Sequence, residues 1–354
     1  MDRNTRLRTG AVAAAGVLAL AGCSSDGGEA ESTVARTSAP VGDSGTQLQQ
    51  QYEQVVDAVL PSVVKIQTDQ GEGSGVVFDG NGNIVTNAHV VAGAKRIQVT
   101  AASGGATLSA QPVGAFAADD LAVVRVKGGT LKPASWGESG KAEVGQIVLA
   151  MGNPLGLSGS VTNGIVSALH RTVSTKGEGA FQGSTIADAI QTSAAINPGN
   201  SGGALVSLSG QVIGVPTAAA SDPAIGGAAA GIGFATPSDT VKRIVPQLIQ
   251  SGKVSNSGRA ALGVTVRTLV DPESGRRTAV AVVQVQRNSG AAKAGIAEGD
   301  LILSVNGTAT PDQTALSSVL AGLKPGDTVK VEVQKSDGSK QQVQVKLGQL
   351  PGGS

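Results

Sequence analysis

Short apolar runs alternate with segments rich in Gly, Asp and Asn along this chain, a pattern typical of β-strands joined by turns. One strand-like stretch, Gly75–Val91, contains the turn residues Asp79-Gly80-Asn81-Gly82-Asn83 and therefore predicts a hairpin. Further runs with strand character lie at Val63–Thr68, Ile97–Thr100, Leu121–Val126, Ile147–Met151, Gly164–Leu169, Ala204–Leu208 and Gln211–Val215. No long helical pattern interrupts these runs, so we expect an all-β body.

Two segments with helical spacing flank this body. Apolar residues between Thr46 and Leu60 recur at helical intervals, and Pro61 ends that segment. Between Pro237 and Gln250 the apolar residues form one face, which predicts a helix that closes the body. Ser238 and Asp239 are its expected N-terminal cap, and Pro246 is expected to kink it.

A polar segment, residues 251–257, is the expected linker between two domains. The body occupies residues 46–250, and a smaller α+β unit is expected at residues 258–348. Two helices, near Ala291–Ala294 and Gln313–Gly322, would lie among its strands. Residues 349–354 are expected to form a frayed tail.

The N-terminus has the pattern of a secretory signal. Three arginines within residues 1–8 precede an apolar run, Gly10–Gly22, that is too short to span a bilayer. Leu20-Ala21-Gly22-Cys23 is similar to a bacterial lipobox, so residues 1–22 are the expected signal peptide and Cys23 the expected lipidation site. An ordinary signal peptide with an incidental cysteine is the alternative. Residues 23–45 are polar and small, which predicts a disordered tether.

Composition limits the other possibilities. A length of 354 residues suggests two or three domains, and an aromatic content of 2% means that Val, Ile, Leu and Ala must build the core. The net charge of +1, without a basic cluster in the folded part, argues against a nucleic-acid partner. Cys23 is the only cysteine, so no intrachain disulfide can form. With two histidines in the chain, metal-ligand spacings are absent, and neither a metal nor another cofactor is expected.

Three motifs carry the candidate chemistry. Ser201 stands in Gly199-Asn200-Ser201-Gly202-Gly203, His89 ends Thr86-Asn87-Ala88-His89, and Asp120 begins Asp120-Leu121-Ala122. They supply a nucleophile, a general base and an orienting carboxylate, in a chain order known for triad catalysis. The N–H groups of Gly199 and Ser201 are the expected oxyanion donors.

Two further residues compete for these roles. Asp119 is adjacent to Asp120, but alternation along a strand turns neighbouring side chains to opposite faces, and the Asp-Leu-Ala-Val register favours Asp120. Asp119 is then expected to be a solvated loop residue. His170 lies beside Arg171 without a carboxylate motif, so it is expected on a surface loop.

These motifs, together with others in the same order, resemble the HtrA/DegP family of trypsin-like serine proteases with a C-terminal PDZ domain. The resemblance covers about Thr46 to Leu347 and departs from the family where Ser193 replaces a frequent Asp and Ala204 a frequent Pro. It implies a double β-barrel followed by a PDZ domain, an acyl-enzyme mechanism and a homotrimer. The additional motifs are Gly73–Val77, Ile84–Val91, Met151–Gly156, Val161–Ser167, Gln191–Ile196 and Gly231–Ala235.

The resemblance also suggests a specificity and a mode of control. The base of the primary pocket would be Ala195, six residues before Ser201, and one wall would come from Ile213–Thr217, including Val215. Because this set has no acidic residue, small or medium aliphatic side chains should fit and basic ones should not. Asn200 cannot form the ion pair of zymogen activation, so control is assigned to ordering of a polar loop, Arg171–Ser184.

In the smaller unit, the resemblance to a PDZ domain places a carboxylate-binding loop at Leu262-Gly263-Val264. Free C-terminal peptides are therefore expected partners. The leading hypothesis is a lipid-anchored protease on the extracytoplasmic face of the membrane that degrades unfolded envelope proteins. A peptide-binding chaperone or scaffold, and a narrow regulatory protease of one signalling partner, remain alternatives.

Overall fold

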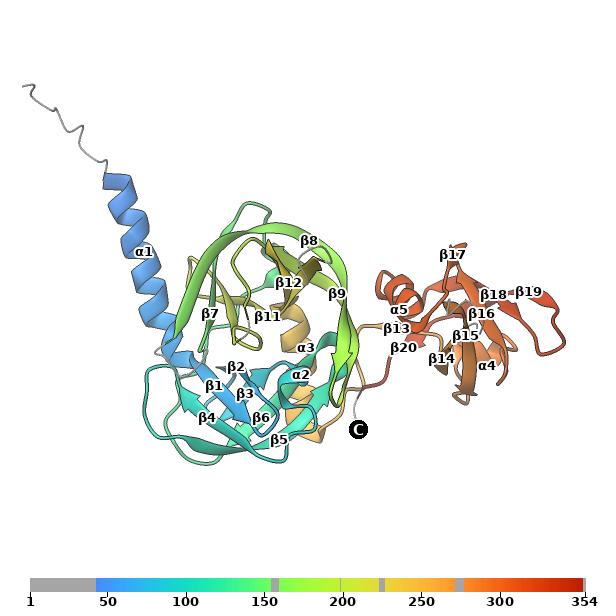
Figure 1. Ribbon diagram of the computed structural model, residues 1–354, viewed down its shortest axis with the longest axis horizontal. Helices are drawn as coiled ribbons and strands as arrows, with labels where there is room; N and C mark the ends of the chain where they lie inside the picture. The colour runs from blue at the N-terminus through green and yellow to red at the C-terminus, as the bar shows by residue number, and fades with distance from the viewer. Residues whose placement is uncertain (1–42, 154–158, 198, 223–226, 271–276, 353–354) are drawn as a thin grey trace, which may run out of the picture. The chain divides into compact units, whose positions relative to one another are not determined.

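Two closed barrels, each of six antiparallel strands, form most of the chain between residues 63 and 237 (Figure 1). The computed structural model describes residues 43–153, 159–197, 199–222, 227–270 and 277–352. In the first barrel the strands follow the order β1-β2-β3-β6-β5-β4. They are β1 (Val63–Thr68), β2 (Glu72–Val77), β3 (Asn83–Thr86), β4 (Ile97–Ala101), β5 (Leu108–Phe116) and β6 (Leu121–Val126).

The second barrel has the order β10-β11-β12-β9-β8-β7. Its strands are β7 (Ile147–Gly152), β8 (Ser160–Glu178), β9 (Phe181–Thr192), β10 (Ala204–Ser207), β11 (Val212–Asp222) and β12 (Gly227–Pro237). Aliphatic residues fill both interiors, as the low aromatic content requires. The predicted double β-barrel is confirmed.

Arg171–Ser184, expected to be a loop, is instead part of a long hairpin. β8 and β9 remain paired through this segment, from Arg171 opposite Ala189 to Glu178 opposite Phe181. Its Ser and Thr residues pair across the two strands, and Thr175 and Ser184 hydrogen-bond through their hydroxyls at 2.9 Å. The polar composition was read as a loop, but β-branched Thr and Val favour a strand.

Helices cover the barrels at two places. α1 (Asp43–Val59) buries Val55 and Val59 against the first and second barrels, and the short η1 (Leu60–Ser62) follows it. α3 (Ser238–Ser251) continues through Pro246 and buries one apolar face, Val241, Ile244, Val245 and Leu248. No helix in the described part of the chain is both long and apolar enough to cross a membrane.

The expected cap of α3 is wrong. Pro237 is the N-cap residue, and no side chain caps the helix there. Ser238 instead donates its hydroxyl to Gly137 O at 3.0 Å and accepts from Ser139 N at 3.1 Å. Asp239 accepts from Gly140 N at 2.7 Å, so both side chains attach the short helix η3 (Ser139–Lys141) to α3.

The C-terminal unit contains a sheet in the order β14-β15-β16-β18-β19, with β17 paired to β16. Two helices, α4 (Gly290–Lys293) and α5 (Gln313–Ala321), accompany it and begin at side-chain caps from Ser289 and Asp312. This is the predicted PDZ-like architecture. The strands are β14 (Val264–Val270), β15 (Arg277–Val285), β16 (Leu301–Val305), β17 (Thr308–Ala309), β18 (Thr328–Gln334) and β19 (Lys340–Lys346).

The linker and the tail pair with each other. β13 (Ala260–Ala261) pairs with β20 (Gly348–Gln349), and Val254 and Gly352 exchange backbone hydrogen bonds of 3.0 and 2.9 Å. We call residues 254–261 and 348–352 together the clasp. The expectation of a frayed tail is therefore wrong for residues 349–352, because their backbone groups find partners in the linker.

Candidate active site

His89 and Asp120 form a hydrogen-bonded pair in the first barrel. The strand expected to reach Val91 ends at Thr86, and His89 lies on a short helix, α2 (Ala88–Val91). The Nδ1 atom of His89 lies 2.7 Å from Oδ2 of Asp120, and the His89 backbone N–H donates to Oδ1 at 3.0 Å. This geometry places the proton on Nδ1, so Nε2 remains available as a base.

A tight turn presents Asp120 to the imidazole. The 3₁₀ helix η2 (Ala117–Asp119) ends at Asp120, whose φ of 51° and ψ of 44° are left-handed. The Asp120 carbonyl accepts from Ala88 N at 3.2 Å and from the Asn87 side chain at 2.9 Å. The carboxyl group is fully buried, so every one of its contacts is with protein.

Thr217 is a functional candidate that sequence reasoning did not single out. Its hydroxyl donates to Oδ2 of Asp120, the atom that also contacts the imidazole. Thr217 belongs to β11 in the second barrel, so the two barrels meet at one carboxylate oxygen. Nothing in the sequence marks this threonine, because the contact depends on how the barrels pack.

The Ser201 loop lies against the strand that leads to His89. The Ser201 carbonyl accepts from Ser74 N at 2.8 Å, and Gly202 N donates to Pro216 O at 2.9 Å. A Cβ on Gly202 would lie 2.2 Å from Ser74 O and 2.5 Å from Thr86 Oγ1, and the φ of Gly202 is +83°. Only glycine allows this approach, which brings Ser201 beside the segment preceding His89.

Gly199, one of the two expected oxyanion donors, has a positive φ of 102°. Its carbonyl accepts the Ser74 hydroxyl at 2.5 Å, and the same hydroxyl oxygen accepts from Asn153 N at 2.8 Å. Ser74 is fully buried and thus fixes both the Gly199 carbonyl and the neighbouring loop. In the sequence, Ser74 is included only as part of the motif Gly73–Val77, and no role is assigned to it. Its position between two glycines is the signal that could have identified it.

The two expected pocket residues differ in their surroundings. Ala195 is exposed, and its carbonyl accepts from Thr162 Oγ1 at 2.9 Å and from Asn200 Nδ2 at 3.2 Å. Val215 is fully buried in a core cluster with Phe116 and Leu121. A Val215 side-chain wall is therefore wrong, because strand alternation turns this side chain into the core.

Asp119 is not the solvated residue that was expected. It is 1% exposed, and its Oδ1 lies 2.6 Å from Nη1 of Arg259. Burial raises the pKa of the Asp119 carboxyl above its ordinary value, while the Arg259 and Arg243 guanidiniums oppose that increase. Neither carboxylate lies on a strand, because Asp119 ends η2 and Asp120 is the left-handed residue that follows it. This turn separates the two side chains, and both are buried.

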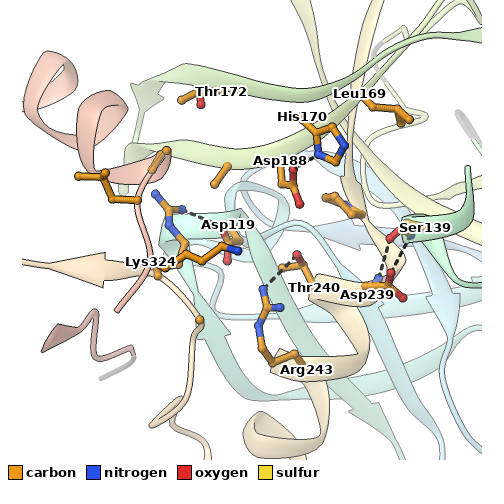
Figure 2. Close-up of a pocket in the computed structure, with 18 of the residues that line it drawn as sticks. Asp119, Ser139, Leu169, His170, Thr172, Asp188, Asp239, Thr240, Arg243 and Lys324 are labelled. Carbon is orange, nitrogen blue, oxygen red and sulfur yellow. Dashed lines mark hydrogen bonds and ion pairs between the residues drawn. The ribbon is translucent and has the colours of Figure 1, made fainter. Parts of the chain in front are cut away.

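His170 is exposed, as expected, but it lies within β8 and has a carboxylate partner. Its Nδ1 atom lies 2.5 Å from Oδ1 of Asp188, and both residues have positive φ, 57° and 64° (Figure 2). The two side chains are 79% and 63% exposed, so solvent screens this pair. It borders a cleft of about 690 Å³ that Asp119, Arg243 and Arg259 also line.

The C-terminal unit has a second candidate site, a groove of about 300 Å³ between β14 and α5. Leu262, Gly263 and Val264 all line it, with Leu316 and Leu320 of α5 opposite. Gly263 has a φ of +80°, and a Cβ there would lie 2.3 Å from Ser289 Cβ. β14 is an edge strand, so its outer backbone groups can pair with an added strand.

The expected lipidation site, Cys23, lies outside the described residues. Within the described ranges, no three His, Cys, Asp or Glu side chains are grouped as metal ligands would be.

Comparisons with known proteins agree with this geometry. A trypsin-like peptidase domain model matches residues 73–215, and a PDZ domain model matches residues 260–347. The serine protease PepD of Mycobacterium tuberculosis is 40% identical over 375 residues, which cover 97% of this chain and 79% of PepD. A probable periplasmic serine endoprotease, DegP-like, of Chlamydia trachomatis is 36% identical over 80% of this chain and 55% of its own length.

A solved structure is similar over both units. The HtrA-type protease AlgW, with a decapeptide, is 31% identical and has a TM-score of 0.55. The similarity covers 84% of this chain and 98% of the AlgW chain.

Proposed function

Because the chain belongs to the HtrA/DegP family of trypsin-like serine proteases with a C-terminal PDZ domain, we propose that Ser201, His89 and Asp120 are its catalytic triad. The observation that carries this assignment is the buried Asp120 carboxylate at 2.7 Å from His89 Nδ1. The close contact of the Gly202 backbone with Thr86 supports this assignment, because it brings the Ser201 loop next to the segment that carries His89.

In this mechanism the Ser201 hydroxyl attacks the scissile carbonyl while His89 Nε2 takes its proton. Asp120 keeps the Nδ1–H tautomer and stabilises the imidazolium that forms. The N–H groups of Gly199 and Ser201 stabilise the developing oxyanion. His89 then protonates the leaving amine, and water hydrolyses the acyl-enzyme by the same steps.

Substrates would be unfolded proteins cut after small or medium aliphatic residues. Ala195 offers no charge at the expected base of the pocket, so a basic side chain would lose its hydration without gaining a partner. The exposed position of Ala195 is compatible with contact to substrate.

The PDZ groove would bind free C-terminal peptides. The backbone of Leu262-Gly263-Val264 would receive the carboxylate, and the peptide would extend β14 as an additional strand. Apolar residues from α5 face the groove, which favours an apolar last residue.

The enzyme would act outside the cytoplasm. A relative is named periplasmic, and the N-terminal sequence has the features of a lipoprotein signal ending at Cys23. Lipidation of Cys23 would hold the enzyme on the extracytoplasmic face of the membrane. A homotrimer built on the protease domains is proposed from the family alone.

The test is cleavage of fluorescein-labelled casein by the purified protein, beside its Ser201→Ala and His89→Ala variants. Each single variant should lose cleavage while it retains the folded spectrum. The double variant should be no slower than either, because triad residues act as a unit. Cleavage that persists in Ser201→Ala, after removal of contaminating proteases, contradicts the triad.

A further inference from the structure

Two attachments from outside the barrels meet at the turn that presents Asp120. We call residues 116–120 the Asp120 turn. Arg259 binds its Asp119 end, and Gly352 packs on its Phe116 end. Both attachments belong to the clasp, where the linker and the C-terminal segment pair.

The Arg259 attachment consists of three acceptors around one nitrogen, which share its two hydrogens. Nη1 donates to the Asp119 carboxylate at 2.6 Å, to Ala118 O at 2.9 Å and to Thr185 O at 2.6 Å. Arg259 is 8% exposed, so these contacts are largely shielded from solvent. Thr185 lies on β9, and the guanidinium therefore holds the turn against the second barrel as well.

The second attachment is a close packing contact. A Cβ on Gly352 would lie 2.2 Å from Cδ2 of Phe116, so the backbone of the C-terminal segment touches the ring. Leu350 packs against the core cluster that contains Phe116, which precedes η2, and Leu121, which follows Asp120. Leu350 N also donates to Arg259 O at 2.7 Å, which joins the two attachments.

Left-handed backbone at Asp120 persists only where its surroundings hold it. From these contacts we propose that Arg259 is a positioning residue for the catalytic step and that the clasp keeps it in place. Its role is to hold the Asp120 turn so that the carboxylate stays at hydrogen-bonding distance from His89. This inference rests on the proposed triad and adds to it residues outside both barrels.

Loss of the attachment should slow acylation more than it weakens substrate binding, because Asp120 acts on the imidazole and does not touch substrate. A misplacement of about 1 Å at a catalytic group can cost on the order of a hundredfold in rate. We therefore expect a decrease of roughly ten- to a hundredfold in kcat for Arg259→Ala, with KM changed by less than about twofold.

The experiment uses the full-length protein and two readouts. One is labelled-casein kinetics, which separate kcat from KM. The other is the rate at which a fluorophosphonate probe modifies Ser201, which requires a working triad and little substrate binding. Both rates are divided by the folded fraction measured by circular dichroism.

Arg243→Ala is the matched control for Arg259→Ala. Arg243 lines the same cleft and also binds the linker, through Nε to Ser257 O at 2.9 Å. Its side chain bonds Thr240 rather than the Asp120 turn (Figure 2). Positioning predicts much slower labelling in Arg259→Ala than in Arg243→Ala, which removes one bond to the clasp but none to the Asp120 turn. Equal labelling rates in the two variants would mean that Arg259 stabilises the fold but does not position the catalytic residues.

Arg259→Ala also leaves the Asp119 carboxylate buried without its partner. The double variant Arg259→Ala, Asp119→Asn removes that charge. It still lacks the hydrogen bonds from Arg259 to the Ala118 and Thr185 carbonyls. Positioning predicts that the double variant remains slow, whereas recovery to the wild-type rate would mean that the uncompensated charge was the whole effect. Arg259→Lys, which retains a buried cationic donor, should recover part of the rate.

A second pair of variants applies even if Arg259→Ala does not fold. Gly352→Val would push on Phe116, whereas a Cβ added at Gly348 in β20 would meet only Ala261 O, at 3.9 Å, so Gly348→Val is the control. We expect slow labelling only in Gly352→Val; identical rates would overturn the role of the clasp. A wrong assignment of the triad would be recognised separately, because the Ser201→Ala variant would then still cleave casein.

Discussion

Thr217 Oγ1 donates its hydrogen bond to Oδ2 of Asp120, the same oxygen that lies 2.7 Å from His89 Nδ1. The threonine comes from the second barrel and the histidine from the first, so this oxygen depends on the docking of the two barrels. The contact predicts a measurable role for Thr217.

Thr217→Val should decrease kcat/KM for casein by roughly ten- to a hundredfold. The variant keeps the shape of the side chain but removes a charge-assisted hydrogen bond, which typically contributes about 1.5–3 kcal/mol. Thr217→Ser retains the hydroxyl and should remain within about threefold of wild type. If valine and serine variants have equal rates, the hydroxyl does not support Asp120.

The positions at which casein is cut show which side chains the primary pocket accepts. Mass spectrometry of the fragments should show cleavage after Val, Ala, Ile and residues of similar size, because nothing acidic is expected at the pocket near Ala195. Comparison with trypsin digestion of the same casein is the control. A majority of cuts after Lys or Arg would contradict this specificity.

Peptides ending in a free apolar residue should bind the PDZ groove, measured by fluorescence anisotropy. Backbone donors at Leu262-Gly263-Val264 explain a need for the terminal carboxylate, so the amidated peptide should bind at least tenfold more weakly, about 1.4 kcal/mol. Leu316→Lys, on the α5 side of the groove, should weaken both peptides. Equal affinity of free acid and amide would contradict carboxylate recognition.

Asp119→Asn should change the pH dependence of stability. The folded-state pKa of Asp119 lies above its ordinary value of 3.8, so ionising this carboxyl destabilises the wild-type fold as the pH rises through and above that value. Asparagine cannot ionise, and the difference in Tm, variant minus wild type, should therefore increase from pH 4 to pH 7. A difference that decreases over this range would contradict the direction of the shift.

Cys23→Ser should release the protein from membranes or leave it as an unprocessed precursor. Cys23 is the only cysteine and ends a lipobox-like motif, and two or more acyl chains anchor far more stably than one. Membrane fractionation of wild type and variant decides the matter. A processed variant that still sediments with membranes would mean that the anchor lies elsewhere.

Local sequence patterns predicted many strands and helices of this molecule, because alternation and helical spacing depend on neighbouring residues. Alternation identified β1, β4, β6 and β7 nearly to the residue, and helical spacing identified α1 and α3. Strand alternation and the Asp-Leu-Ala-Val register favour Asp120 over Asp119, and the structure places Asp120 against the imidazole, although a turn before β6 rather than alternation separates the two side chains.

Two of the failures have a common physical cause, which is burial by parts distant in sequence. Asp119 resembles a solvated residue until Arg259, 140 positions later, covers it. Val215 seemed free to line a pocket, yet it packs in a core cluster that the helix α3 completes. The third failure is local: polar Arg171–Ser184 has the composition of a loop, but it pairs within one hairpin, with Thr175 opposite Ser184 and Arg171 opposite Ala189.

The clasp affects how the PDZ domain can be removed. Strands β13 and β20 pair at the entrance and exit of that domain, so it is topologically an insertion between two neighbouring strands. Simple truncation before residue 257 also deletes Arg259 and Leu350, and the resulting loss of activity would be attributed wrongly to missing peptide regulation. A chimaera that retains residues 254–261 and 348–352, and replaces the domain between them with a short turn, would separate the two contributions.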